Sequence, residues 1–137
     1  MHCYVIEHVS FAIFSFQNIP QDIQNNWIQV ASPYYSKCIC ASGADITAAE
    51  NILGKLIYPN DPCLKCFTKC IEVELGLMLS DGTVVPEAWV RQVAAITPEI
   101  AEKCVNNTID ISDTCEKAYD YSQCLVEEVC MSINIKP

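Results

Sequence analysis

The sequence predicts an all-α domain whose helices are tied together by disulfide bonds. Apolar residues recur with helical periodicity along nearly the whole chain, and no strand-like alternation rises above noise. The 137 residues include ten cysteines, a density that is typical of oxidised, exported proteins. Hydrophobic residues make up 51% of the chain, which suffices for one core, and no linker indicates a second domain.

Two helices are predicted before the cysteine-rich centre of the chain. Residues 20–37 carry a helical pattern that Pro33 is expected to bend. Residues 48–56 form the next helix, and we expect Thr47 to be its N-cap. Glu50 follows Thr47 at the spacing of a capping box, which favours this assignment.

A central helix is predicted to begin at Pro62. Asp61 stands where it can cap the first turn, and proline is favoured at the first helical position. Helical spacing places Cys63, Cys66 and Cys70 on one face, so the helix presents several thiols to its neighbours. The predicted apolar face, which adjoins this face, comprises Leu64, Phe67, Ile71, Leu75 and Met78.

Three further helices are predicted in the second half of the chain. Pro86 opens the first of them, and Thr97 caps the second with Pro98 in its first turn. Asp113 precedes the last helix, which we expect to extend to about Val129.

The N-terminal residues 1–18 are expected to be a secretory signal or an N-terminal extension, with the helical domain in residues 19–137. Residues 9–16, VSFAIFSF, form an apolar run that suits a signal peptide and is too short to span a membrane. The alternative is an N-terminal segment that packs on the domain. No other stretch reaches transmembrane length.

The stretch CLKCFTKC at residues 63–70 allows a zinc site, a redox dithiol or a disulfide framework. A zinc site would combine Cys38 and Cys40 with Cys63 and Cys66, a spacing that is unusual and leaves other cysteines unexplained. A redox dithiol follows a strand, whereas turn residues precede Cys63. We therefore expect a disulfide framework, with no metal and no cofactor.

The last helix supports this framework. Cys115 and Cys124 lie nine residues apart, and on an α-helix this spacing points the two side chains to opposite sides. A helix with thiols on opposite sides is expected to be bridged to two different neighbours. Simple core packing of reduced cysteines explains so many thiols on so many elements less well.

The cysteine spacing resembles that of insect odorant-binding proteins of the pheromone and general-odorant type. That family carries a Cys-x3-Cys, matched here by Cys66 and Cys70, and a Cys-x8-Cys, matched by Cys115 and Cys124. Cys38, followed by ICASGAD, looks like the first cysteine of the family. The stretches NDPCLKCFTKC and LGLMLSDG resemble the family's second and third cysteines and the turn that follows them.

The resemblance covers roughly residues 20–130 and implies about six helices around an apolar cavity. Cys40, Cys63 and Cys130 depart from the six-cysteine pattern, so the chain resembles an extra-cysteine variant. Of the possible additional bridges, Cys40 with Cys63 is the one we expect first. The bridges that the resemblance itself implies are Cys38–Cys70, Cys66–Cys115 and Cys104–Cys124.

The resemblance implies an extracellular carrier of a small hydrophobic ligand, such as an odorant, a pheromone or a lipid-like molecule. Plain core packing is the alternative for each candidate wall residue, because periodicity cannot separate a core from a cavity wall. Tyr34, Tyr119 and Ser122 could orient a ligand oxygen. The ten candidate ligand-binding residues are Trp27, Tyr34, Leu56, Leu75, Met78, Trp89, Val93, Ala118, Tyr119 and Ser122.

Partners and location are also implied by the resemblance. The implied partners are a small hydrophobic ligand and a membrane chemoreceptor, and the implied oligomeric state is a monomer or a homodimer. The implied location is insect extracellular fluid, such as sensillar lymph. In some family members the C-terminal tail covers the pocket. For residues 131–137 of this chain, a frayed tail is the simpler expectation.

An enzyme is not predicted. Both histidines are N-terminal, and the glutamate pairs Glu72 with Glu74 and Glu127 with Glu128 do not share a helix face, so we expect them on the solvated surface. The net charge of −9 disfavours nucleic acid as a partner. It also disfavours the alternative of a disulfide-rich defence or inhibitor protein, because such proteins often act through basic charge.

Overall fold

The computed structural model describes residues 19–135, which fold into seven α-helices and one short 3-10 helix. Apart from isolated β-bridge residues at Ile57 and at the antiparallel pair Met78 and Val84, the described backbone is helix, turn, bend or coil. This confirms the all-α prediction. The elements are α1 (Gln21–Ala31), η1 (Ser32–Tyr34), α2 (Tyr35–Ser42), α3 (Ile46–Lys55), α4 (Pro62–Glu74), α5 (Pro86–Gln92), α6 (Pro98–Thr108) and α7 (Thr114–Ile135).

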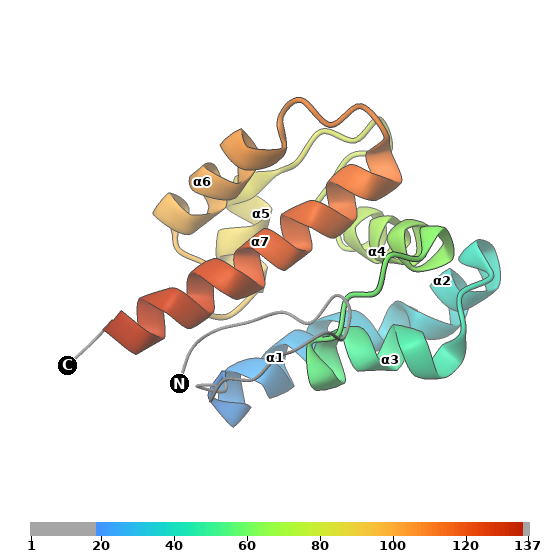
Figure 1. Cartoon of the computed structure of the whole chain (residues 1–137), viewed down its shortest axis with the longest axis horizontal. Helices are drawn as coiled ribbons and strands as arrows, with labels where there is room; N and C mark the ends of the chain where they lie inside the picture. The colour runs from blue at the N-terminus through green and yellow to red at the C-terminus, as the bar shows by residue number, and fades with distance from the viewer. Residues whose placement is uncertain (1–18, 136–137) are drawn as a thin grey trace.

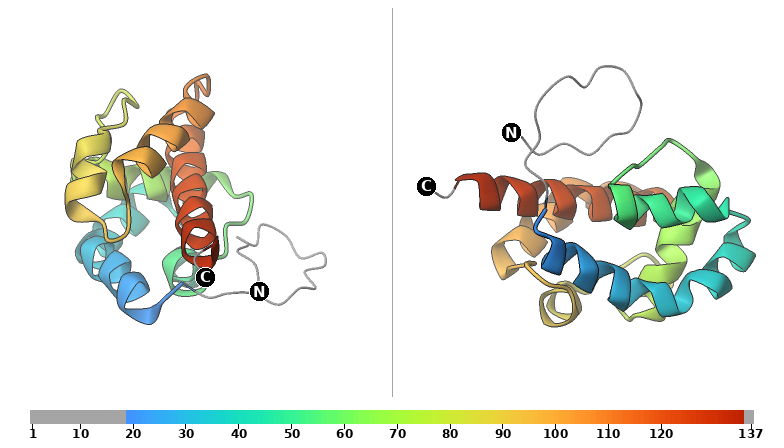
Figure 2. Two further views of the ribbon diagram at one scale, coloured as in Figure 1. Left: turned by 90° about the vertical axis from the view of Figure 1, so that its left-hand side faces the viewer. Right: turned by 90° about the horizontal axis from the view of Figure 1, so that it is seen from below.

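The long helix α7 crosses the middle of the domain (Figure 1) and packs against α4 and α6. Helix α4 also packs on α2, α5 packs on α6, and α1 packs on α3. In Figure 2, α1 and α7 run along different sides of the domain. None of the helices in the described part of the chain is long and apolar enough to cross a membrane.

Most of the predicted helix starts are confirmed. The Asp61 carboxylate accepts hydrogen bonds from the backbone N–H groups of Cys63 (2.8 Å) and Leu64 (3.2 Å) at the start of α4. The Thr97 hydroxyl accepts from the Ile100 N–H at 3.1 Å at the start of α6. Pro33 lies in the 3-10 turn that separates α1 from α2, as expected for a residue that bends the element.

The cap predicted for α3 is wrong. Helix α3 begins at Ile46, and its N-cap is Asp45, whose carboxylate accepts from the Ala48 N–H at 2.9 Å. Thr47 therefore lies within the first turn. The reason lies in the preceding turn, where Gly43 ends α2 in a left-handed conformation (φ 74°). The chain therefore enters α3 two residues earlier than the capping-box spacing indicates.

Two helix ends also differ from the prediction. Helix α4 ends at Glu74, because Gly76 takes a left-handed φ of 72° and the N–H groups of Leu77 and Met78 turn back to the Glu72 carbonyl. Helix α7 continues past Val129 to Ile135, so this part of the tail is helical and not frayed. Ile133 packs against the core, which gives the last turns an apolar contact.

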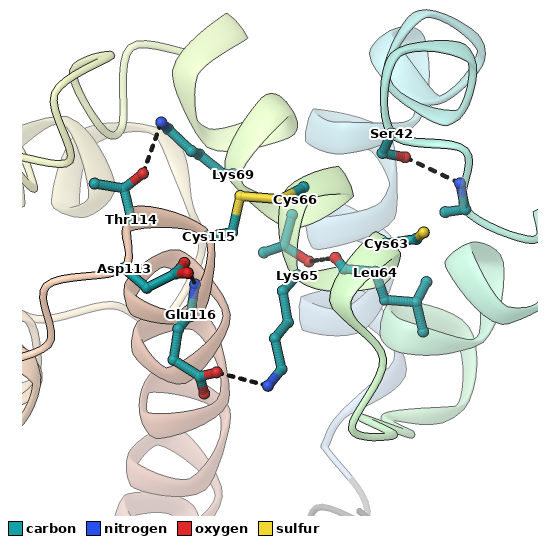
Figure 3. The surroundings of a disulfide bond; sticks show 12 residues. Ser42, Cys63, Leu64, Lys65, Cys66, Lys69, Asp113, Thr114, Cys115 and Glu116 are labelled. Carbon is teal, nitrogen blue, oxygen red and sulfur yellow. Dashed lines mark hydrogen bonds and ion pairs between the residues drawn. A yellow bond between two sulfur atoms is a disulfide. The ribbon is translucent and has the colours of Figure 1, made fainter.

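All three bridges that the family resemblance implies are present in the structure, and they join α2 to α4, α4 to α7 and α6 to α7. Cys115 and Cys124 therefore lead to different helices, as their opposed faces indicate. Around the α4–α7 bridge (Figure 3), Lys65 pairs with Glu116 at 2.6 Å and Lys69 donates to the Thr114 hydroxyl at 2.8 Å. The bridges are Cys38–Cys70, Cys66–Cys115 and Cys104–Cys124.

The expected Cys40–Cys63 bridge does not form, and both thiols are free and exposed. Cys38 faces α4, since it is bonded to Cys70. Cys40 follows it by two residues, a step of about 200° on an α-helix, and so points away from α4. Cys130 is disulfide-bonded. The expectation of a signal or extension in residues 1–18 lies outside the described residues.

Candidate ligand-binding cavity

An apolar cavity, partly open to solvent, lies between the helices, with walls from α1, α3, α4, α5 and α7 and from Tyr35 at the start of α2. The space open to the centres of water-sized molecules is about 80 Å³, which exceeds what a single water needs several times over. The segments after α4 and after α5 supply Leu77, Val93 and Ile96. Helices far apart in sequence therefore meet around one small chamber.

Both tryptophans of the sequence line this cavity. The indole N–H of Trp27 donates to the Ala94 carbonyl at 2.9 Å, and that of Trp89 donates to the Leu77 carbonyl at 3.1 Å. Because their polar N–H groups are already paired with backbone, the two rings offer apolar surface to the interior. This arrangement suits contact with a hydrophobic molecule.

Five of the ten predicted ligand-binding residues line the cavity and five do not. Residue Met78 lies in the core beyond the end of α4, and Tyr119 donates its hydroxyl to the Pro59 carbonyl at 2.8 Å. Ala118 is buried in α7, one helical turn before the lining residue Ser122. Tyr34 in η1 and Leu56 at the α3 C-cap are only partly buried. The five that line the cavity are Trp27, Leu75, Trp89, Val93 and Ser122.

Several apolar wall residues were missed by the sequence prediction. Ile52, Phe67 and Ile71 line the cavity and belong to the apolar stripes of α3 and α4. The helical periodicity marked these positions as inward-facing, but it could not show whether a helix neighbour or an empty space lies opposite them. Tyr35 and Ile96 had no comparable signal, because each lies at the end of an element or in a loop.

The prediction that Glu72 lies on the solvated surface is wrong. Glu72 is 2% exposed and lines the cavity, whereas Glu74 is on the outside, where it pairs with Lys37 at 2.8 Å. Among the described residues, neither carboxylate oxygen of Glu72 has a hydrogen-bond partner. Removal from water raises the pKa of the Glu72 carboxyl well above its usual range, which favours the neutral acid.

The other polar groups in the wall already have partners. The Thr68 hydroxyl donates to the Leu64 carbonyl at 3.0 Å, within α4. The Ser122 hydroxyl is 2.8 Å from that of Tyr58, a buried residue whose pKa is raised by desolvation. Within residues 19–135, no cluster of three or more His, Cys, Asp or Glu side chains is arranged to hold a metal ion.

The fold and the cavity define a helical, disulfide-bonded protein with an apolar chamber in its interior. A profile of the PBP/GOBP family matches residues 21–128, and the chain therefore belongs to this family of insect odorant-binding proteins. Membership and fold together support a carrier of small hydrophobic ligands, and the family is a non-enzymatic one.

Individual relatives agree with this assignment. The chain is 26% identical over 96 residues to general odorant-binding protein 69a of Drosophila melanogaster, which covers 66% of this chain and 62% of that protein. The match thus spans less than two thirds of the relative. The fold is similar to that of the odorant-binding protein dmelOBP28a from Drosophila melanogaster, with a TM-score of 0.61, 19% identity, and coverage of 80% of this chain and 97% of that one.

Proposed function

We propose that this protein is an extracellular carrier that binds one small hydrophobic molecule in the cavity described above. The observation that carries the proposal is a cavity between the helices whose wall is almost entirely apolar and includes both tryptophans. Disulfides between the helices around it limit how far the domain can collapse into that space. A carrier needs such a chamber, whereas a simple structural domain would fill it with side chains.

Intrinsic fluorescence provides the first test. Since both tryptophans line the cavity, an apolar ligand should change their emission in a saturable way with one site per chain. We expect a Kd near micromolar, equivalent to about −8 kcal/mol. Correctly oxidised protein that shows no saturable binding of any apolar probe would remove the carrier proposal.

A cavity-filling variant provides the second test. Ala49 lines the cavity, so Ala49→Leu should occupy part of it and weaken probe binding by about tenfold or more with little loss of stability. Ala88 is equally buried but does not line the cavity, which makes Ala88→Leu the matched control. The control should lose about 1–3 kcal/mol of stability by overpacking. Equal effects of the two variants on binding would argue against this chamber as the site.

Location and partners belong to the same proposal. Disulfides persist in oxidising compartments, which supports secretion into insect extracellular fluid such as sensillar lymph. We propose that residues 1–18 act as a signal and that a membrane chemoreceptor is a further partner. Expression of the whole chain in insect cells, followed by N-terminal sequencing of the secreted product, tests the signal. Secreted protein that still begins at Met1 would refute it.

A further inference from the structure

We propose that the Glu72 carboxyl is the polar anchor of the cavity and that it selects hydrophobic ligands carrying a hydroxyl or carbonyl oxygen. The inference rests on the carrier function proposed above and specifies the class of ligand. It is carried by a buried acidic side chain that lines the cavity and has no hydrogen-bond partner among the described residues.

An unpartnered polar group is unusual in this wall. Thr68 and Ser122 have their hydroxyls bonded, and the indole N–H groups of Trp27 and Trp89 are bonded to backbone carbonyls. Buried polar groups in folded proteins nearly always find a partner, and each exception calls for an explanation. A ligand that supplies the missing hydrogen bond explains why a carboxyl is tolerated at position 72.

The protonation state determines which ligand groups fit. Burial favours the neutral acid, which offers one O–H donor and one carbonyl acceptor. An alcohol can satisfy both, because its hydroxyl accepts and donates, and an aldehyde, ketone or ester oxygen satisfies the donor. A hydrocarbon of the same shape satisfies neither and leaves the carboxyl unpaired.

Charged ligands fit the site less well. None of the described lining side chains carries a positive charge, so an ionised fatty acid would find no counter-charge in the wall. An ammonium ligand would require Glu72 to ionise, and both charges would lose their hydration inside an apolar chamber. The observations therefore favour a neutral, oxygen-containing molecule.

The test compares 2-phenylethanol with n-propylbenzene, in which a methyl group replaces the hydroxyl. The dissociation constants of both are measured by tryptophan fluorescence for the wild type, Glu72→Met, Glu72→Gln and Thr108→Val. Comparing the ratio of the two constants between variants removes the contribution of ligand hydration in water, because that contribution is common to all of them.

We expect the preference for 2-phenylethanol over n-propylbenzene to fall by about tenfold in Glu72→Met, the effect of losing one buried hydrogen bond. Glu72→Gln should retain the preference within about threefold, because its amide also donates and accepts. Thr108→Val should leave the ratio unchanged, since Thr108 does not line the cavity and its buried hydroxyl already donates to the Cys104 carbonyl within α6. Equal ratios in the wild type and Glu72→Met would overturn the proposal.

Two further measurements, the binding of 2-phenylethylamine and infrared spectra, distinguish a neutral Glu72 from a charged one. If 2-phenylethylamine binds the wild type most tightly and Glu72→Gln abolishes that binding, Glu72 acts as a charged partner and the proposal is wrong. Infrared spectra provide a readout that does not depend on Glu72→Met folding. The band of the protonated carboxyl, absent in Glu72→Gln, should shift with 2-phenylethanol and not with n-propylbenzene. If neither probe binds saturably, the carrier function itself fails.

Discussion

Glu72 is held in the cavity by the backbone that surrounds it. Its own carbonyl accepts hydrogen bonds from the N–H groups of Leu77 (2.8 Å) and Met78 (3.3 Å), which fix the end of α4. The side chain therefore cannot leave the interior without disturbing the turn that follows. A carboxyl kept in an apolar site lowers the stability of the folded state whenever it must ionise.

This placement predicts a pH-dependent stability. The unfolded chain releases the Glu72 proton near pH 4.3, whereas the folded protein retains it to higher pH because its pKa is raised. Between these two values the folded state binds more protons, so stability is greatest below the unfolded pKa and falls as pH rises through the folded one. Relative to Glu72→Gln, the wild type should lose about 1.4 kcal/mol per pH unit within that window.

Urea unfolding of both proteins at a series of pH values, from about pH 4 upward, provides the measurement. Other titrating groups are shared by the two proteins, so their contributions cancel in the difference. Parallel stability curves across the whole range would show that Glu72 is not held as a buried neutral acid.

At the scale of the helices, each of the three described disulfides between helices has an ion pair beside it. These pairs join the same helices as the bridges, with N–O distances of 2.6–3.0 Å, and at least one partner in each is substantially exposed. Exposed ion pairs contribute only about 0–1 kcal/mol each, so the bridges dominate. The pairs are Lys37–Glu74 beside Cys38–Cys70, Lys65–Glu116 beside Cys66–Cys115, and Lys103–Glu128 beside Cys104–Cys124.

The extended end of α7 leads to a prediction about the tail. None of the described side chains after Val126 lines the cavity. A chain that ends at Cys130 should keep its ligand affinity within about twofold while losing about 1–3 kcal/mol of stability, because Ile133 no longer packs against the core. Ile133→Ala is the matched point variant. A tenfold loss of affinity in the shortened chain would instead indicate a lid.

At the scale of the whole molecule, overlapping bridges connect α2, α4, α6 and α7 into one frame. Of the three bridges described above, Cys66–Cys115 spans the longest stretch, a sequence separation of 49, and so restricts the unfolded chain most among them. Such a frame allows the domain to keep an apolar chamber that hydrophobic packing alone would tend to fill.

Removal of that bridge should therefore be costly. In the chain-entropy model, Cys66→Ala with Cys115→Ala is expected to lose about 4 kcal/mol of unfolding free energy, measured in urea without reductant. The matched control, Cys40→Ala with Cys63→Ala, removes two exposed free thiols and should change stability by less than about 0.5 kcal/mol. A loss of several kcal/mol in the control would mean that Cys40 and Cys63 are bonded after all.

Much of the fold could be predicted from the sequence because the signals were local. The caps Asp61 and Thr97 and the prolines at helix starts act within one turn of the chain, and the spacing of the six cysteines indicated the family. Boundaries that depend on the neighbouring turn were missed, such as the Asp45 cap of α3 and the end of α4 before Gly76.

By itself, the sequence determined the helical class, the positions of most helices and the family, since periodicity, capping and cysteine spacing are properties of the chain. Only the tertiary structure decided which apolar residues face an empty chamber and which face another side chain. Glu72 shares a helix face with Lys65 and Lys69, which makes it look solvated until α7 packs across that face. Whether a side chain is buried depends on which helix packs against its face, and in this fold the packing helix is distant in sequence.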